Sequence, residues 1–150
     1  MRIEEALQTR KFRDEKHKGV LNLLYTAYWM KIQISTVLKE YGITTEQFNV
    51  LRILRGSLPK HLCVKEIGSR MIEKSSNVPR ILERLQRDGL VERISSPKDK
   101  RESVSVITPK AMDILQRLDQ KVIEQENAFM PISEEEATLL NSILDKIRQG

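Results

Sequence analysis

Apolar residues recur three and four positions apart along most of the chain, which is the spacing of one helix face. Over 20–38 they form a long stripe, so a first helix is predicted there, ending near Gly42. A second helix is predicted to begin at a capping box made by Thr44 and Gln47 and to run to Gly56. The first third of the chain is therefore predicted to be mostly helical.

The next two predicted helices are shorter and lie close together. Cys63 stands at the N-cap position of a third helix, which follows a turn at Pro59. A fourth helix begins at Ser75 or Ser76, and Ser76 is favoured because Pro79 then falls in the first turn, where its missing N–H removes no hydrogen bond. Two helices joined by so short a turn are typical of a helix-turn-helix.

After Gly89 closes the fourth helix, the spacing of the apolar residues changes from helical to alternating. Leu90–Ile94 and Glu102–Ile107 are predicted as two strands of a hairpin, joined by a polar loop over 96–101. Val64–Thr108 therefore has the pattern of a helix-turn-helix with a wing, which is typical of modules that bind duplex DNA.

Two further helices complete the predicted fold. Thr108 and Pro109 suit the N-cap and the first position of a fifth helix, and Pro131 ends it. Ser133 and Glu136 form a second capping box, which starts a sixth helix. The predicted fold class is mainly α, an α+β winged helix with six helices and a two- or three-stranded β-wing.

The fourth helix has two chemically different faces. Its apolar residues face the predicted core, and its polar residues lie opposite at i, i+3, i+7 and i+10: Asn77, Arg80, Arg84 and Arg87. Asn can bond adenine and Arg can bond guanine through paired hydrogen bonds, so the first three are candidate base-reading residues. Ser75 and Ser76 are candidate phosphate contacts, because free N–H groups at a helix start favour anions. The alternative is a solvated face on which Arg87 pairs with Glu83.

The loop between the two predicted strands carries three basic side chains and one acidic side chain: Lys98, Asp99, Lys100 and Arg101. A hairpin with a basic tip can reach the DNA backbone and the minor groove beside the groove that a helix occupies. Asp99 is expected to orient the guanidinium of Arg101 and not to touch DNA. The alternative is an ordinary solvated turn.

Positive charge is concentrated in this part of the chain. Lys60–Lys110 contains 12 Lys and Arg against 7 Asp and Glu, whereas the remainder contains 14 of each, so the segment holds the whole formal net charge of +5. A local basic excess attracts a polyanion, while evenly spread charge mainly serves solubility.

Cysteine content and hydropathy bear on the compartment. The single cysteine, Cys63, excludes an intramolecular disulfide and fits a reducing cytoplasm. Met1–Lys18 lacks the apolar core of a signal peptide, and Val20–Met30 is too short to span a bilayer. A cytoplasmic protein is therefore expected.

Three stretches are more specific when they are taken together: Thr44–Leu51, Leu82–Arg93, and Asp99–Arg101 leading to Ile107–Lys110. Their content and order resemble the MarR (multiple antibiotic resistance regulator) family of winged helix-turn-helix transcription factors. The third stretch is similar to the family's wing signature, an acidic residue two before an Arg and then a strand ending in Leu or Ile followed by Thr. The chain departs from common family residues at three positions: Ser96, Lys100 and Ala111.

The resemblance implies a division of the single unit 1–150 into two kinds of segment. Helices in 1–42 and 112–150 would form a homodimer, and 43–111 would form the DNA-binding winged helix. Two reading helices about one DNA turn apart, roughly 34 Å, imply a pseudo-palindromic double-stranded operator. Repression is the family's commoner mode, so a repressor is expected.

A small-molecule effector is also implied by the resemblance. In the family, small aromatic or phenolic compounds often bind between the dimerisation helices and the winged helix and lower the affinity for DNA. Tyr25, Tyr28 and Trp29 are the candidate lining of such a pocket. Aromatic residues at helical spacing more often belong to a core, which is the alternative. No cofactor is implied.

Other classes of function differ in the residues they need. A winged-helix adaptor for proteins would use the same fold without needing Asn77, Arg80 or Arg101. A thiol-based redox sensor would use Cys63, because a helix N-cap favours the thiolate. A closed zinc site needs four ligands, and the chain offers two histidines and one cysteine. An enzyme is not expected, because the sequence has no nucleophile elbow, P-loop or dinucleotide-binding glycine pattern.

Overall fold

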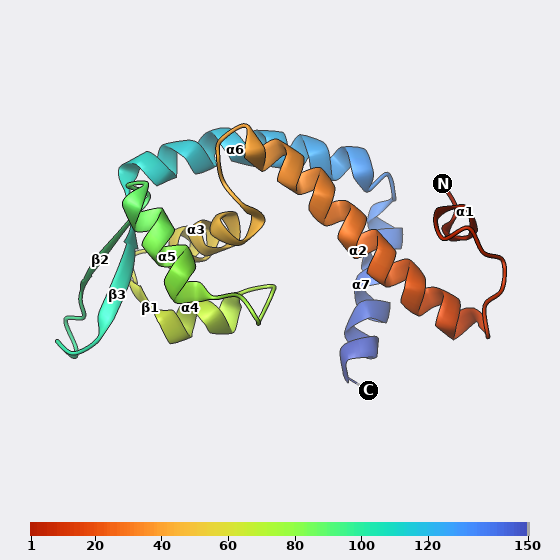
Figure 1. The fold of residues 1–150 in the computed structure, drawn as a ribbon, viewed down its shortest axis with the longest axis horizontal. Helices are drawn as coiled ribbons and strands as arrows, with labels where there is room; N and C mark the ends of the chain where they lie inside the picture. The colour runs from red at the N-terminus through yellow and green to blue at the C-terminus, as the bar shows by residue number, and fades with distance from the viewer. Residues whose placement is uncertain (150) are drawn as a thin grey trace.

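The computed structural model describes residues 1–149, which form two lobes connected by a long helix (Figure 1). One lobe is the winged helix. The other is an arm in which the first half of α2 (Glu15–Lys39) and α7 (Glu134–Gln149) extend away from it. Helix α6 (Pro109–Phe129) runs from the wing to this arm, so the two lobes share one continuous element.

The N-terminal part contains more helix than the sequence predicts. Helix α2 begins five residues before the predicted start, because Asp14 caps it by accepting a hydrogen bond from the N–H of His17 at 2.7 Å. A one-turn helix, α1 (Ile3–Ala6), precedes it and makes a seventh helix in the described chain. Helix α3 (Thr45–Ser57) begins at the predicted capping box, which is confirmed.

The helix-turn-helix consists of α4 (Val64–Arg70) and α5 (Val78–Arg87). Cys63 is the N-cap of α4, as predicted. The predicted cap of α5 is wrong by one residue, because Asn77 and not Ser76 occupies that position. Gly89, at a φ of +72°, ends the helix in the left-handed conformation that glycine adopts without strain.

A three-stranded antiparallel sheet forms the wing and its base. Its strands are β1 (Leu62–Cys63), β2 (Val91–Ser95) and β3 (Ser103–Ile107), in the order β1-β3-β2. Val91 pairs with Ile107 and Ser95 with Ser103, so β2 and β3 stay in register over their whole length. The predicted hairpin is confirmed, and β1 provides the third strand.

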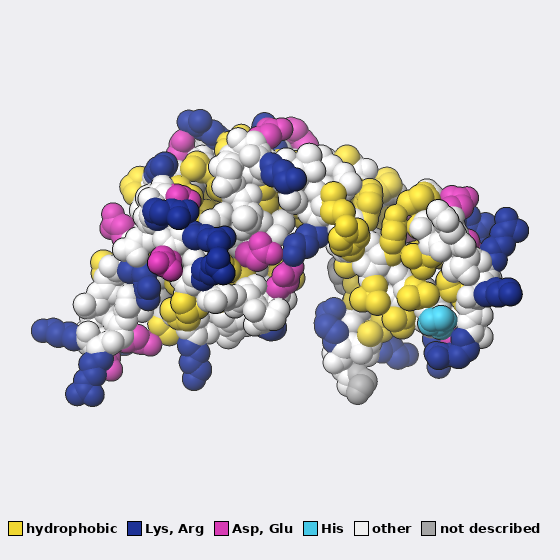
Figure 2. Space-filling model, in the orientation of Figure 1, with side chains coloured by type: hydrophobic (Ala, Val, Ile, Leu, Met, Phe, Trp, Pro, Cys, Tyr) yellow, Lys and Arg dark blue, Asp and Glu magenta, His cyan; other side chains and the backbone are white. Residues whose placement is uncertain are grey.

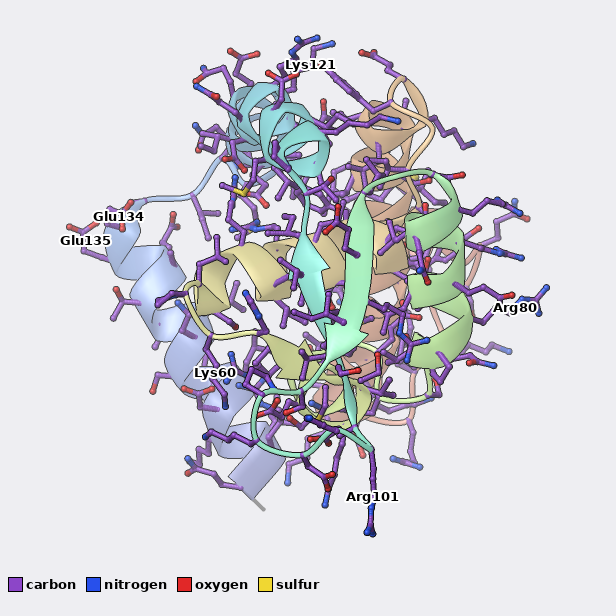
Figure 3. All side chains as sticks on the ribbon, turned by 90° about the vertical axis from the view of Figure 1, so that its left-hand side faces the viewer. Lys60, Arg80, Arg101, Lys121, Glu134 and Glu135 are labelled. Carbon is purple, nitrogen blue, oxygen red and sulfur yellow. The ribbon has the colours of Figure 1, made fainter. Side chains whose placement is uncertain are left out.

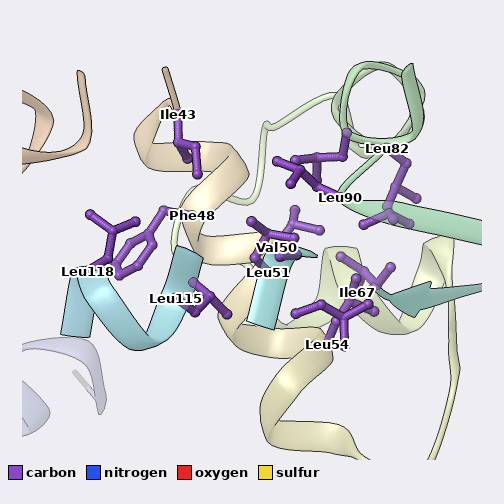
Figure 4. Close-up of a cluster of buried hydrophobic side chains, with 14 of the residues drawn as sticks. Ile43, Phe48, Val50, Leu51, Leu54, Ile67, Leu82, Leu90, Leu115 and Leu118 are labelled. Atoms are coloured by element: carbon purple, nitrogen blue, oxygen red, sulfur yellow. The ribbon is translucent and has the colours of Figure 1, made fainter. Parts of the chain in front are cut away.

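The hydrophobic core is centred on α3 (Figure 4). Leu51 and Leu54 of α3 are buried against Ile67 of α4, and Leu115 and Leu118 of α6 pack on the same cluster. The first part of helix α6 is therefore packed into the core of the winged helix, and its second part continues into the arm.

A two-bond ion pair also joins α3 to α6. The guanidinium of Arg55 donates to the carboxylate of Asp119 at 2.7 and 2.9 Å. These bonds lower the pKa of Asp119 below its usual value. Because both side chains are partly exposed, the pair fixes the position of α6 more than it adds stability.

The arm leaves apolar side chains uncovered. Leu24 and Tyr28 of α2 are each 65% exposed, and Leu139 of α7 is 62% exposed. Ile143 and Ile147 continue the same stripe, and α7 has no buried residue in its described length. Figure 2 shows hydrophobic side chains gathered on the arm, whereas Lys and Arg side chains extend from the wing tip. None of the described helices is both long enough and apolar enough for a membrane span.

Candidate nucleic-acid interface

Helix α5 separates buried from exposed side chains as the sequence predicts. Val78, Leu82 and Leu85 are buried in the core, and Arg80 and Arg84 are exposed on the other side. Arg80 extends outward from the helix into solvent (Figure 3). Within residues 1–149, no salt bridge holds either guanidinium, so their donors stay open to a base edge or a phosphate.

Asn77 has a structural role at the start of α5. Its Oδ1 accepts a hydrogen bond from the N–H of Arg80 at 3.2 Å. A two-bond contact with adenine would need this oxygen as well as Nδ2. The cap occupies one of the two lone pairs of Oδ1, so a two-bond contact with adenine would have to share this oxygen with the Arg80 N–H.

Replacing Asn77 with alanine is expected to destabilise the fold by ~1 kcal/mol, because the cap is lost. The midpoint of thermal unfolding should fall by roughly 2–4 °C. Asn77→Ser is the matched control, because serine caps about as well but has no Nδ2. Calorimetry should show a lower unfolding midpoint for the alanine variant alone. Equal decreases in the midpoint for both variants would show that loss of the cap is not the cause.

The two serines before the cap differ in accessibility. Ser75 is exposed, so its hydroxyl is open to a phosphate. The Oγ of Ser76 is buried and has no hydrogen-bond partner in the described chain, and its N–H donates to the carbonyl of Glu73 at 3.1 Å. In this conformation Ser76 therefore lacks the phosphate-binding groups that the sequence suggested.

Free N–H groups are also fewer than expected in the first turn of α5. The N–H of Val78 donates to the carbonyl of Ser76 at 3.0 Å, and that of Arg80 is occupied by the cap. Pro79 has no N–H. Of the backbone positions from Asn77 to Arg80, only the N–H of Asn77 has no hydrogen-bond acceptor in the described chain, so side chains would supply most of any contact with a phosphate.

The tip of the wing is ordered by Ser96 and displays its basic side chains. Ser96 is buried, and its Oγ accepts hydrogen bonds from the N–H groups of Lys98 at 3.3 Å and Asp99 at 3.5 Å. Lys98, Lys100 and Arg101 are exposed. Arg101 points away from the body of the protein at the end of the hairpin (Figure 3).

Asp99 orders the wing through the backbone. Its Oδ1 accepts a hydrogen bond from the N–H of Arg101 at 2.9 Å, and its carbonyl accepts one from the N–H of Glu102 at 3.0 Å. The prediction that Asp99 orients the Arg101 guanidinium is corrected, because an aspartate two residues back closes the turn itself. The guanidinium stays free to reach DNA.

Lys31 connects α2 to the helix-turn-helix. Its Nζ lies 3.1 Å from Glu46 Oε1 at the start of α3 and 2.5 Å from Glu73 Oε1 in the α4–α5 turn. Hydrogen bonds to Glu73 and Glu46 raise the pKa of Lys31. The lysine is 15 and 42 residues from its partners, so no local spacing pattern in the sequence could have identified the three.

A cavity of about 790 Å³ lies between α2, α6 and the winged helix. Tyr28, Phe48 and Val122 are among its apolar lining residues. Of the three aromatic residues predicted to line an effector pocket, only Tyr28 lines this cavity. Trp29 instead packs edge-to-face on Phe129, with ring centroids 5.8 Å apart, and Tyr25 is not part of the wall.

Two carboxylates lie both at the cavity and at a groove beside α5. Glu46 and Glu73 line the cavity and also border a groove of about 290 Å³ beside α5. That groove contains Arg80 and Arg84. Glu46 and Glu73 therefore lie between the cavity and the candidate DNA-binding surface, and Lys31 forms ion pairs with both of them.

The cluster around Cys63 caps helix α4. Glu66 accepts a hydrogen bond from the N–H of Cys63 at 3.0 Å, and its other oxygen lies 2.5 Å from Lys60 Nζ. Lys60 and the Cys63 N–H lower the pKa of Glu66 from 4.5 to about 2. Cys63 itself is half-buried. Within residues 1–149, no group of three or more His, Cys, Asp or Glu side chains is placed to hold a metal ion.

An exposed basic face on α5 beside a basic, ordered wing defines a winged-helix protein of the DNA-binding class. A model of the MarR family matches residues 41–102. The uncharacterised HTH-type transcriptional regulator YkoM of Bacillus subtilis (strain 168) is 32% identical over 109 residues, which are 72% of this chain and 70% of that protein. The chain belongs to the MarR family of transcriptional regulators.

Solved structures show the same fold at lower sequence identity. Sco3205, a MarR family regulator from Streptomyces coelicolor in complex with DNA, matches with a TM-score of 0.81 at 19% identity, over 93% of this chain and 90% of that chain. The organohalide-sensing regulator RdhR-CbdbA1625, in its 2,4-dichlorophenol-bound form, matches with a TM-score of 0.80 at 21% identity. The match covers 91% of this chain and 80% of that chain. The winged-helix MarR fold is therefore confirmed over nearly the whole chain.

Proposed function

We propose that the protein is a cytoplasmic homodimeric repressor that binds a pseudo-palindromic, double-stranded operator. The observation that carries the proposal is the pair of free guanidinium groups on α5, Arg80 and Arg84, beside the basic wing tip. The contacts to DNA would come from these two residues and from five others: Ser75, Asn77, Lys98, Lys100 and Arg101. Ser76 is left out because its hydroxyl is buried.

The uncovered apolar arm supports the homodimer. Its stripe of exposed leucine, isoleucine and tyrosine side chains is larger than scattered surface residues would explain, and burial against a second copy would remove it from water. In this proposal, 1–42 and 112–150 supply the dimer interface and 43–111 binds one half-site. Two wings and two α5 helices then face the duplex together.

A binding experiment on the protein's own upstream region tests the proposal. A labelled duplex from that region should be retarded at low salt, and the affinity should fall steeply as salt rises, because Lys and Arg release counterions from phosphates. Binding to a specific duplex should survive an excess of random competitor. Failure to bind any duplex would favour a winged-helix adaptor for proteins.

We further propose that the cavity beside Tyr28 takes a small aromatic or phenolic effector that weakens DNA binding. Its size and largely apolar lining suit such a ligand, and a structural relative is known in a 2,4-dichlorophenol-bound form. The effector must prefer the dimer that does not bind DNA, and a tenfold loss of affinity needs about 1.4 kcal/mol of coupling. Lys31 is placed to transmit this effect, because it pairs with Glu46 and Glu73, which border both the cavity and the groove beside α5.

Replacing Lys31 with methionine is expected to weaken operator binding about fivefold, or ~1 kcal/mol, which allows for the solvent exposure of both ion pairs. The α4–α5 turn would lose its link to α2, and two unpaired carboxylates would remain near the DNA. Lys39→Met removes the same charge from the same helix and should change affinity little. Fluorescence anisotropy measures the operator affinity of both variants. Equal losses of affinity would show that the effect comes from the change in net charge alone.

A further inference from the structure

One carboxylate lies in the middle of the basic face of α5. Glu83 is exposed and is three residues after Arg80 and four before Arg87, so all three lie on the outward side of the helix. Val78, Leu82 and Leu85 define the opposite, buried side. Glu83 would therefore face the duplex if α5 enters the major groove.

Glu83 is not neutralised by its arginine neighbours. The guanidinium of Arg87 pairs with Asp88, with Nε 3.5 Å from Oδ1, and so does not form the alternative pair with Glu83. No salt bridge within residues 1–149 involves Glu83. Both of its carboxylate oxygens remain available as acceptors.

On a surface that faces DNA, a free carboxylate can make a favourable contact only with a donor on a base edge. It repels phosphates, so it weakens binding to duplexes in general. Glutamate accepts a hydrogen bond from the amino group of cytosine in the major groove, whereas adenine places its N7 acceptor beside its amino group and so disfavours a carboxylate. Glu83 lies three residues, or ~4.5 Å along the helix axis, from Arg80, which is within two base-pair steps of ~3.4 Å.

We propose that Glu83 determines operator specificity by accepting a hydrogen bond from the amino group of a cytosine, once in each half-site. The inference rests on the proposed DNA-binding function and adds the base that this residue reads. Arg80 and Glu83 together read neighbouring base pairs, the arginine through guanine and the glutamate through cytosine. Duplexes without that cytosine meet an unpaired negative charge and bind less tightly.

Selection from a duplex library with a randomised core tests this inference with the full-length wild-type protein and three variants. Wild type should enrich one cytosine position per half-site, preferred about tenfold or more over other bases. Glu83→Ala should lose that preference. Glu83→Gln should shift it toward adenine, which glutamine bonds in a two-bond contact. Both variants should bind random duplexes more tightly than wild type does.

Glu124→Gln on α6 is the charge-matched control and should select the wild-type sequence. An unchanged cytosine preference in both Glu83 variants would overturn the inference while leaving the regulator intact. Failure of the wild type to enrich any sequence would instead overturn the proposed function, and the inference with it. Circular dichroism of each variant establishes that these exposed substitutions leave the fold unchanged.

Discussion

Replacing Arg80 with alanine should weaken binding to the operator about tenfold or more, which corresponds to ~1–3 kcal/mol. Arg80 is exposed at the N-terminal end of the reading face, and no acidic group of the described chain holds its guanidinium. A contact with a guanine would be lost completely, because alanine offers no donor. Anisotropy titrations with the operator and with a random duplex measure this loss and its dependence on sequence.

The matched control for this prediction is Arg117→Ala on α6. Arg117 is exposed and pairs with Asp113 at 2.9 Å, so its removal also lowers the net charge by one without touching the reading face. Arg80→Ala should lose more on the operator than on the random duplex, whereas Arg117→Ala should lose little on either. Equal losses on both duplexes would place Arg80 on the phosphates and not on a base.

Replacing Ile143 with glutamate should dissociate the homodimer and reduce operator affinity about 100-fold or more. Ile143 lies on the exposed apolar stripe of α7, between Leu139 and Ile147. A carboxylate buried there without a partner costs several kcal/mol. A monomer also loses the advantage of engaging two half-sites at once. Sedimentation gives the mass, and gel shifts give the affinity.

Asn141→Glu is the control for this second prediction. Asn141 is exposed on the same helix but lies away from the stripe, so the variant adds the same charge outside the proposed interface. It should remain a dimer and bind the operator as wild type does. A dimeric Ile143→Glu protein with full affinity would remove α7 from the interface.

The order of the elements was predictable because local signals determine where most of them begin. The Thr44–Gln47 and Ser133–Glu136 capping boxes form as predicted. The alternation along β3 and the glycine at Gly89 likewise gave the hairpin and the end of α5. Helix α1 was missed because four residues are too few to show a helical period.

The details of the candidate site were less predictable because several residue types can do the same local work. Ser76 and Asn77 both suit an N-cap, and only the structure shows that the oxygen of Asn77 reaches the N–H of Arg80. Asp99 two residues before an arginine suggested an ion pair, yet the carboxylate bonds the backbone. For Trp29, helical spacing could not separate the cavity wall from packing on Phe129.

The contacts of Lys31 with Glu46 and Glu73 depend on tertiary structure alone. Their residues belong to three separate segments, and each would look like an ordinary solvated charge in the sequence. The same limit applies to Glu83, whose proposed role follows from finding that Arg87 pairs elsewhere. The sequence therefore predicted the candidate DNA-binding surface in outline, and the structure shows how this surface is connected to α2.

A hydroxyl-radical footprint on the duplex that the protein enriches from genomic DNA tests the central claim most directly. Two protected segments are expected, with centres one helical turn apart, about 10–10.5 base pairs, and with approximate two-fold symmetry in sequence. Protection should extend into the minor grooves flanking each segment, where the wings lie. A single protected segment without symmetry, or no protection at all, would contradict a dimer that reads DNA with two α5 helices.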